Sequence, residues 1–178
     1  MEEDVGEVLI TSKDIEGKTA ELAHQIMADY QGKDLLLVCI LKGGLMFLAD
    51  LMRQIDLPLE IDFMAVSSYG DSTESSGVVR ILMDLETNIQ GRNVLIVEDI
   101  IDTGRTLNYI IQNLRTRHPA SLKICTLLNK TARRVLDIPV HYVGFEIPDK
   151  FVIGYGLDYG EIYRNLPFVG VLKPELYS

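Results

Sequence analysis

Short aliphatic runs that alternate with helical segments constrain the fold of this chain more than any other feature. The runs are rich in β-branched residues and occupy residues 35–41, 61–66, 94–98, 123–128 and 140–145. Segments of helical character precede or follow them closely, at residues 13–31, 43–55 and 103–117. Buried parallel strands have continuous apolar runs, and the crossovers between them are usually helical. The pattern predicts an α/β fold with a mostly parallel central sheet flanked by helices.

Length, composition and charge limit the classes of function. The chain has 178 residues and 47% hydrophobic content, so we expect a single domain over residues 1–178. The formal net charge of −9 argues against a nucleic-acid surface, because binding phosphates over a large area requires clustered Lys and Arg. Cys39 and Cys125 lie inside apolar runs without zinc or disulfide spacing, so we interpret both as core thiols. The acidic N-terminus has no long apolar stretch, so we expect no signal peptide or membrane anchor and a cytoplasmic location.

Two segments depart from the alternating pattern. Residues 67–79 are rich in Ser, Gly and acidic residues, and we expect a mobile loop that is too long to be only a connector. From about residue 146, aromatic, Gly and polar residues are mixed without clean periodicity. We expect this segment to fold over one end of the sheet.

The stretch "VLIVEDIIDTGRTL" (94–107) places three acidic residues directly after an apolar run. If the apolar run is a buried strand, Glu98 and Asp99 lie at its polar carboxyl end, where open α/β sheets bind ligands. Asp102 then begins a turn into the next helix. Gly104 permits close approach of the backbone, and Thr103 and Thr106 add hydroxyl donors beside the helix N-terminus. Together these features predict a phosphate-binding loop.

A simpler interpretation is that Asp102 and Thr103 only cap the helix. The neighbouring pair Glu98 and Asp99 favours a ligand site, because a helix cap does not require these two acids. Acidic residues beside a phosphate-binding loop accept hydrogen bonds from sugar hydroxyls, lie near a magnesium ion, or accept a proton. The residues themselves leave these three roles open.

This stretch resembles the defining motif of the type I phosphoribosyltransferases: a hydrophobic strand, two acids, and an acid-Thr-Gly-x-Thr loop that binds phosphoribosyl pyrophosphate. Further segments resemble the branch of the family that acts on hypoxanthine and guanine, in the same order and at similar spacing. They are "LKGGLMF" (41–47), "SSYG…SSG" (67–77), "LLNK" (127–130) and "DKFVIGYGLDYGEIYRNLP" (149–167). The resemblance covers most of the chain. Its one departure is Arg105, where many relatives have Lys, and this keeps the charge.

The resemblance implies an enzyme of purine salvage, a pentosyl (glycosyl) transferase. Its substrates would be phosphoribosyl pyrophosphate and an oxopurine base, and its products IMP or GMP and pyrophosphate. The family further implies Mg²⁺ as cofactor, a homodimer or homotetramer, and a small hood that the terminal segments form over the sheet. The preference among hypoxanthine, guanine and xanthine stays open.

The resemblance also implies roles for the residues around the motif. Asp102 would take the proton from the imidazole nitrogen of the purine as that nitrogen attacks the anomeric carbon of the ribose. Glu98 and Asp99 would face the ribose 2- and 3-hydroxyls, directly or through magnesium and water. The ribose 5-phosphate would be held by Thr103, Gly104, Arg105 and Thr106.

Pyrophosphate and base contacts are implied outside the motif. Lys42 and Gly43 would present backbone donors to pyrophosphate, after a cis peptide between Leu41 and Lys42. Arg164 would reach pyrophosphate, and Asp158 would bind magnesium.

Lys130 would donate to the purine 6-oxo group, where adenine offers an amino donor instead. Phe151 would stack on the purine, with the main chain of Val152 and Leu157 at the base edge. Tyr69, in the 67–79 loop, would close over the site and exclude water.

Two other classes of protein fit the sequence less well. "LIVED" also occurs in response-regulator receiver domains, but there the acidic pair ends the first strand, whereas here it follows the midpoint of the chain. An RNA-binding regulator built on the phosphoribosyltransferase fold would need a basic face, and a net charge of −9 offers little for one.

Overall fold

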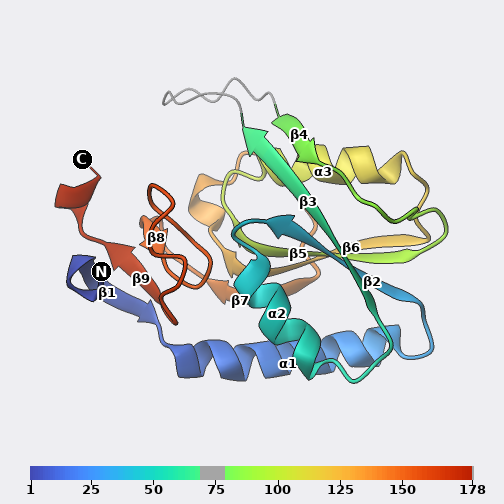
Figure 1. The fold of residues 1–178 in the computed structure, drawn as a ribbon, viewed down its shortest axis with the longest axis horizontal. Coiled ribbons are helices and arrows are strands. Elements are labelled where there is room, and N and C mark those ends of the chain that lie inside the picture. The colour runs from blue at the N-terminus through green and yellow to red at the C-terminus, as the bar shows by residue number, and fades with distance from the viewer. Residues whose placement is uncertain (69–78, 178) are drawn as a thin grey trace.

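A mixed sheet with the strand order β4-β3-β2-β5-β6-β7 forms the centre of the molecule (Figure 1). The computed structural model describes residues 1–68 and 79–177, so the predicted Tyr69 contact lies outside the described residues. All neighbouring strands run parallel except β3 and β4, which are antiparallel. The predicted α/β fold is thereby confirmed. The strands are β2 (Leu35–Leu41), β3 (Glu60–Ser68), β4 (Val79–Met83), β5 (Asn93–Ile101), β6 (Ser121–Asn129) and β7 (Tyr142–Glu146).

The register of β5 determines where the acidic residues lie. Its pairing with β2 reaches Cys39 opposite Val97, whereas its pairing with β6 continues to Ile101 opposite Asn129. The sequence predicted a strand that ends at residue 98, but β5 extends to Ile101, and Glu98 and Asp99 therefore lie inside it. Beyond Val97 the strand is held by β6, so these acids occupy the edge where the carboxyl ends of β2, β5 and β6 meet.

Helices cover both faces of the central sheet. In Figure 1, α1 and α2 lie on one face and α3 lies on the other. Their bounds are Ser12–Tyr30, Leu45–Gln54 and Arg105–Arg115. Alternate residues of the buried strand β2 face opposite sides, so Leu37 and Cys39 pack with α1 and α2, and Leu36 and Val38 pack with α3. Within the described residues, no helix is both long and apolar enough to cross a membrane.

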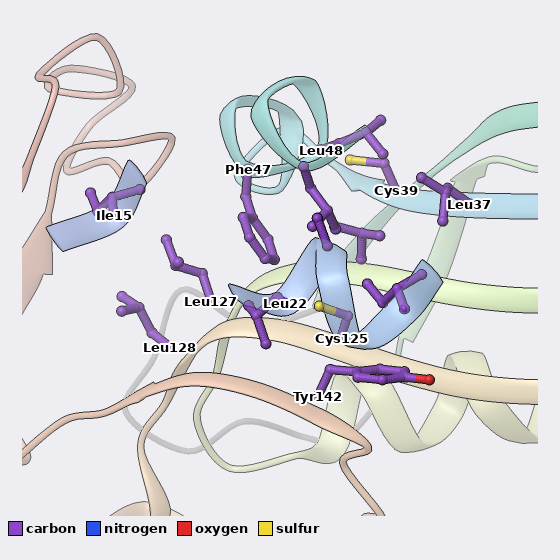
Figure 2. Close-up of a cluster of buried hydrophobic side chains, with 14 of the residues drawn as sticks. Ile15, Leu22, Leu37, Cys39, Phe47, Leu48, Cys125, Leu127, Leu128 and Tyr142 are labelled. Carbon is purple, nitrogen blue, oxygen red and sulfur yellow. The ribbon is translucent and has the colours of Figure 1, made fainter. Parts of the chain in front are cut away.

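Both cysteines are buried free thiols within the core on the α1–α2 face. Figure 2 shows them among Leu22 of α1, Phe47 of α2 and other apolar side chains. Burial raises the pKa of Cys39 to about 12, and the nearby charges of Glu98 and Asp99 add to the shift. These features confirm the interpretation of both residues as core thiols.

The two ends of the chain form a second, smaller sheet, which is the predicted hood. Its strand order is β1-β9-β8, and both pairings are antiparallel. The strands are β1 (Val5–Ile10), β8 (Val152–Ile153) and β9 (Val169–Leu172). The chain between β8 and β9 packs directly against the segment after β2, because a Cβ atom at Gly156 would lie 2.1 Å from the Gly43 carbonyl oxygen. Short 3₁₀ helices lie at Glu2–Asp4, Thr131–Arg133 and Pro174–Leu176.

A buried carboxylate on β3 holds the chain that follows β4. Asp62 is 7% exposed, and its two carboxylate oxygens accept hydrogen bonds from the N–H groups of Phe63 at 2.7 Å and Thr87 at 2.8 Å. Burial raises the pKa of Asp62, but the backbone donors outweigh it and hold the pKa below its ordinary value. The folded state therefore stabilises the ionised carboxylate.

We expect Asp62→Asn to lower the free energy of unfolding by about 1–3 kcal/mol, because the amide NH₂ would face one of these N–H donors. Since the folded pKa is depressed, the unfolded state binds more protons below the ordinary pKa. The wild-type contribution is therefore present at neutral pH and is lost as the pH falls through the folded pKa. Urea denaturation of both proteins between pH 7 and pH 3 measures this, and equal stabilities at pH 7 would refute the role of Asp62.

Candidate active site

The turn from β5 into α3 contains a glycine, Gly104, at a position where any other residue would be strained. Gly104 has φ +83° and is the N-cap of α3, and no side chain caps it. A Cβ atom here would lie 2.7 Å from Ile138 Cδ1, and the left-handed conformation favours glycine. The interpretation of Asp102 as a helix cap is therefore wrong. The Thr103 hydroxyl accepts only a long hydrogen bond of 3.4 Å from the Arg105 N–H.

A cavity of about 130 Å³ gathers most of the predicted sugar-phosphate residues. The first N–H groups of a helix lack partners within the helix, and the helix dipole favours an anion there. Two threonines and the N-terminus of α3 at one cavity therefore suit a phosphate group. The cavity is lined by Glu98, Ile100, Ile101, Asp102, Thr103, Gly104, Thr106 and Leu107.

A larger cavity, of about 420 Å³, lies away from this edge of the sheet. None of the predicted site residues that the structure describes lines it. Ligands of open α/β sheets bind beyond the carboxyl ends of the strands, so we assign the candidate site to the smaller cavity and its surroundings. The residues that line the larger one are Ser12, Ile15, Glu16, Asp50, Arg53, Gln54, Tyr155 and Pro167.

Glu98 and Asp99 are an interacting pair of acids in a less polar setting than the sequence predicted. Glu98 is 8% exposed, since β5 continues past it and the core lies beneath it. Burial raises the pKa of Glu98 well above its usual range, and the charge of Asp99 and a hydrogen bond to Asp99 add to the shift. Burial also raises the pKa of Asp99, which the Ile100 N–H and the charge of Arg164 partly offset. Water solvates an exposed carboxylate but is largely excluded from this buried pair. Ligand hydroxyl groups could donate hydrogen bonds to Glu98 and Asp99 in its place.

Asp102 and Lys130 face each other from the ends of neighbouring strands. Lys130 Nζ lies 3.8 Å from Asp102 Oδ2, and Arg133 Nη1 lies 3.6 Å from the same oxygen. Asp102 Oδ1 is buried and has no hydrogen-bond partner among the residues that the structure describes. Such an orphaned buried oxygen is rare in proteins, and a ligand donor at this position would satisfy it.

Lys130 is a buried cation with spare donor capacity. It is 5% exposed, and its Nζ donates one hydrogen bond, of 2.9 Å, to the Lys150 carbonyl. Asp149 Oδ1 lies farther away, at 3.9 Å. Because an ammonium group has three donors, Lys130 can also donate to a ligand oxygen beside Asp102.

The predicted pyrophosphate residues lie together where the hood meets the end of β2. The peptide between Leu41 and Lys42 is cis, as the resemblance implied. A Cβ atom at Gly43 would lie 1.9 Å from Asp99 Oδ2, so the backbone here has to be glycine to approach that carboxylate. Lys42 Nζ pairs with Glu161 Oε2 at 2.7 Å, and Arg164 Nη2 pairs with Asp158 Oδ1 at 3.1 Å.

The Phe151 ring belongs to a group of three aromatic side chains at the hood. It is 38% exposed, stacks on Tyr177 at 4.8 Å with an interplanar angle of 24°, and meets Tyr159 edge-on at 5.7 Å. A purine that stacks on Phe151 has to use the face that Tyr177 leaves uncovered.

The predicted base contacts of Lys130, Phe151, Val152 and Leu157 all stay predictions. Val152 pairs with Val171 in the hood sheet. The Leu157 N–H donates to the Gly154 carbonyl at 3.1 Å, and the Leu157 carbonyl accepts from the Gly154 N–H at 3.0 Å.

Sequence reasoning missed several residues that line this edge. Arg133 approaches Asp102, and Arg134 Nε donates to the Asp102 carbonyl at 3.1 Å. The segment "TARR" directly after "LLNK" was the available signal, because it places two guanidinium groups close to a strand end. Glu161 and Tyr177 lie in irregular chain, where no periodic pattern identifies a contact.

The residues of this site suit a magnesium ion that a phosphorylated ligand would hold together with the protein. Among the described residues, no three His, Cys, Asp or Glu side chains are grouped as metal ligands. Mg²⁺ is usually held by one or two carboxylates together with substrate phosphates. The Asp158 carboxylate, which pairs with Arg164 at 3.1 Å, offers this kind of partial ligand set.

Comparison with known proteins assigns the chain to a family. The family model for the phosphoribosyl transferase domain matches residues 9–160, which include the central sheet and most of the candidate site. The chain therefore belongs to the phosphoribosyl transferase family.

Its place within that family is among the bacterial hypoxanthine-guanine phosphoribosyltransferases. The enzyme of this name from Mycobacterium avium is 53% identical, over 98% of this chain and 89% of the relative. The one from Staphylococcus aureus is 54% identical, over 100% of this chain and 99% of the relative. A crystal structure of a hypoxanthine phosphoribosyltransferase from Staphylococcus aureus superposes with a TM-score of 0.97 at 54% identity and covers 100% of this chain and 97% of that chain.

Proposed function

We propose that this protein transfers the 5-phosphoribosyl group from phosphoribosyl pyrophosphate to hypoxanthine and guanine, giving IMP or GMP and pyrophosphate. The observation that supports this most is the Asp102 carboxylate. Asp102 lines the cavity at the α3 N-terminus, its Oδ2 lies 3.8 Å from the Lys130 ammonium group, and its buried Oδ1 has no partner among the described residues. A base with an acidic N–H and a nearby oxo group would satisfy both residues at once, while the phosphate end of the ribose occupies the loop.

Binding would fix the sugar at both ends. The N-terminus of α3 and the hydroxyls of Thr103 and Thr106 would hold the 5-phosphate. Glu98 and Asp99 would accept hydrogen bonds from the ribose hydroxyls. Holding the donor in this way converts the attack of the base into an effectively unimolecular step.

Asp102 would accept the proton that the base loses in the reaction. The bond between the anomeric carbon and the imidazole nitrogen forms as the bond to the pyrophosphate oxygen breaks. The nitrogen becomes acidic during this step, and Asp102 Oδ1 would accept its proton. Lys130 would donate to the 6-oxo group and stabilise negative charge on the base.

The leaving group would depart toward Lys42 and Arg164. Their charges, and the backbone at Gly43, would stabilise pyrophosphate. Asp158 would hold Mg²⁺ together with substrate oxygens, and the ion would neutralise charge on the leaving group.

The test is a forward reaction with phosphoribosyl pyrophosphate, MgCl₂ and one base at a time. With hypoxanthine or guanine, we expect equal amounts of nucleotide and pyrophosphate. Pyrophosphate release without nucleotide, or no turnover with either base, would contradict the proposal.

A glycine substitution tests the contact between the pyrophosphate loop and Asp99. The Cβ atom of Gly43→Ala would overlap Asp99 Oδ2, so the loop or the carboxylate has to move. We expect the KM for phosphoribosyl pyrophosphate to rise about tenfold or more, because small displacements in a positioned site have effects of this size. Steady-state kinetics measures the change.

Gly17→Ala is the matched control for this substitution. Gly17 lies in α1, and a Cβ atom there would meet nothing within 4 Å. The control should leave the KM unchanged and raise stability slightly. An unchanged KM in Gly43→Ala would rule out the close contact with Asp99.

Three expectations stay predictions. The sequence predicts a cytoplasmic location and the organisation of residues 1–178 as one domain, and the family implies a homodimer or homotetramer. The pairing of β1 with β9 supports the single domain, because it joins the two ends of the chain.

A further inference from the structure

The carboxylate of Glu161 pairs with both cations, Lys42 and Arg164, that the proposed function assigns to pyrophosphate. Glu161 Oε2 lies 2.7 Å from Lys42 Nζ, and Glu161 Oε1 lies 3.1 Å from Arg164 Nη2. These two side chains come from segments that are more than a hundred residues apart in the sequence, and the carboxylate of Glu161 bridges them.

The position of Glu161 is fixed locally and not by the core. Its backbone N–H donates to Asp158 Oδ2 at 2.9 Å, and its φ is +67°. Its side chain and that of Lys42 are well exposed, with relative exposures of 62% and 66%. An exposed carboxylate between two cations lies where a ligand anion would compete with it.

Arg164 retains other contacts when this pair is broken. Its Nη1 donates to the Gly156 carbonyl at 2.7 Å, and its Nη2 also pairs with Asp158. Its Nε is buried, and no atom of residues 1–68 or 79–177 pairs with it. The guanidinium group is therefore held in place by the hood independently of Glu161, so displacing Glu161 would leave Arg164 available to an incoming anion.

We propose that Glu161 is an internal competitor for the pyrophosphate position: its carboxylate pairs with Lys42 and Arg164 in the free protein, is displaced when pyrophosphate or phosphoribosyl pyrophosphate binds, and returns as pyrophosphate leaves. This inference rests on the proposed function, which assigns both cations to pyrophosphate. Glu161 thus weakens the affinity for the donor and for the leaving group by the same factor and leaves the affinity for the base unchanged.

The test is calorimetric titration of the protein with pyrophosphate in saturating MgCl₂. For Glu161→Gln we expect the Kd for pyrophosphate to fall roughly three- to tenfold. This is the size expected when one or two exposed ion pairs no longer compete with the ligand. The KM for phosphoribosyl pyrophosphate should fall by a similar factor, and the KM for hypoxanthine should stay the same. Glu161→Asp, whose shorter side chain reaches one cation at most, should lie between the wild type and Glu161→Gln.

Glu21→Gln is the matched control, because Glu21 is an exposed acid on α1 that pairs with Lys18 at 2.9 Å. It removes the same charge and a similar ion pair outside the site, and it should leave the Kd unchanged. An equal decrease in the control would show that net charge alone is responsible. An unchanged or higher Kd in Glu161→Gln, at an unchanged melting temperature, would overturn the inference. If the wild type neither binds pyrophosphate nor forms IMP, the proposed function itself fails.

Discussion

Asp102→Asn should lower kcat about 10²–10⁴-fold, which is the range in which a general base contributes. Asparagine is nearly isosteric with aspartate but does not accept the proton of the attacking nitrogen. The affinity for phosphoribosyl pyrophosphate should change little, because the phosphate loop and the cations beside Asp102 remain. Steady-state and single-turnover kinetics with hypoxanthine measure the two effects separately.

Asp137→Asn is the control for this substitution, because Asp137 is an exposed aspartate in the chain that follows the 3₁₀ helix Thr131–Arg133. It should leave kcat unchanged. If Asp102→Asn instead abolished donor binding and left single-turnover chemistry normal in the residual complex, Asp102 would belong to the architecture of the loop, and its role as general base would be excluded.

The second large effect concerns the choice of base. Adenine should react with a kcat/KM at least about 10³-fold below that of hypoxanthine, because sites that hydrogen-bond a substrate group discriminate strongly against its absence. The buried Lys130 ammonium can only donate, and adenine offers a donor at the same position. The adenine amino group would therefore leave a buried cation without its acceptor.

Replacing this cation should reduce the discrimination. Lys130→Gln supplies an amide that can accept as well as donate, so the ratio between the two bases should narrow, mainly through loss of activity with hypoxanthine. Lys123→Gln, on the same strand β6 but paired with Asp29 at 3.8 Å, should leave the ratio unchanged. Comparable rates with adenine and hypoxanthine in the wild type would be incompatible with the assigned role of Lys130.

Periodicity predicted the helices and the parallel strands of the central sheet because burial determines them. The antiparallel strand β4, which is mostly exposed, was not predicted. The run of residues 35–41 is β2 as observed, since all its positions are buried or nearly so. Strand β1 was not predicted, because it is mostly exposed and pairs with β9, more than 150 residues away. Such pairing depends on tertiary contacts and not on local pattern.

The candidate site was predictable where side-chain chemistry is concentrated in the sequence. The motif around Asp102 places its acids and its phosphate loop on consecutive residues. The raised pKa of Glu98 was not predictable, because it depends on how far β5 continues and on what covers it. The ion pair between Lys42 and Glu161 depends on how the hood packs against β2.

A crystal structure of the complex with IMP tests the arrangement of the site most directly. The account predicts the 5-phosphate at the N-terminus of α3, against Thr103 and Thr106. It predicts the base on the uncovered face of Phe151, with its 6-oxo group hydrogen-bonded to Lys130 and its imidazole nitrogen nearest Asp102. A nucleotide bound in the larger cavity between α1 and α2, or a base that lies away from Lys130, would contradict it.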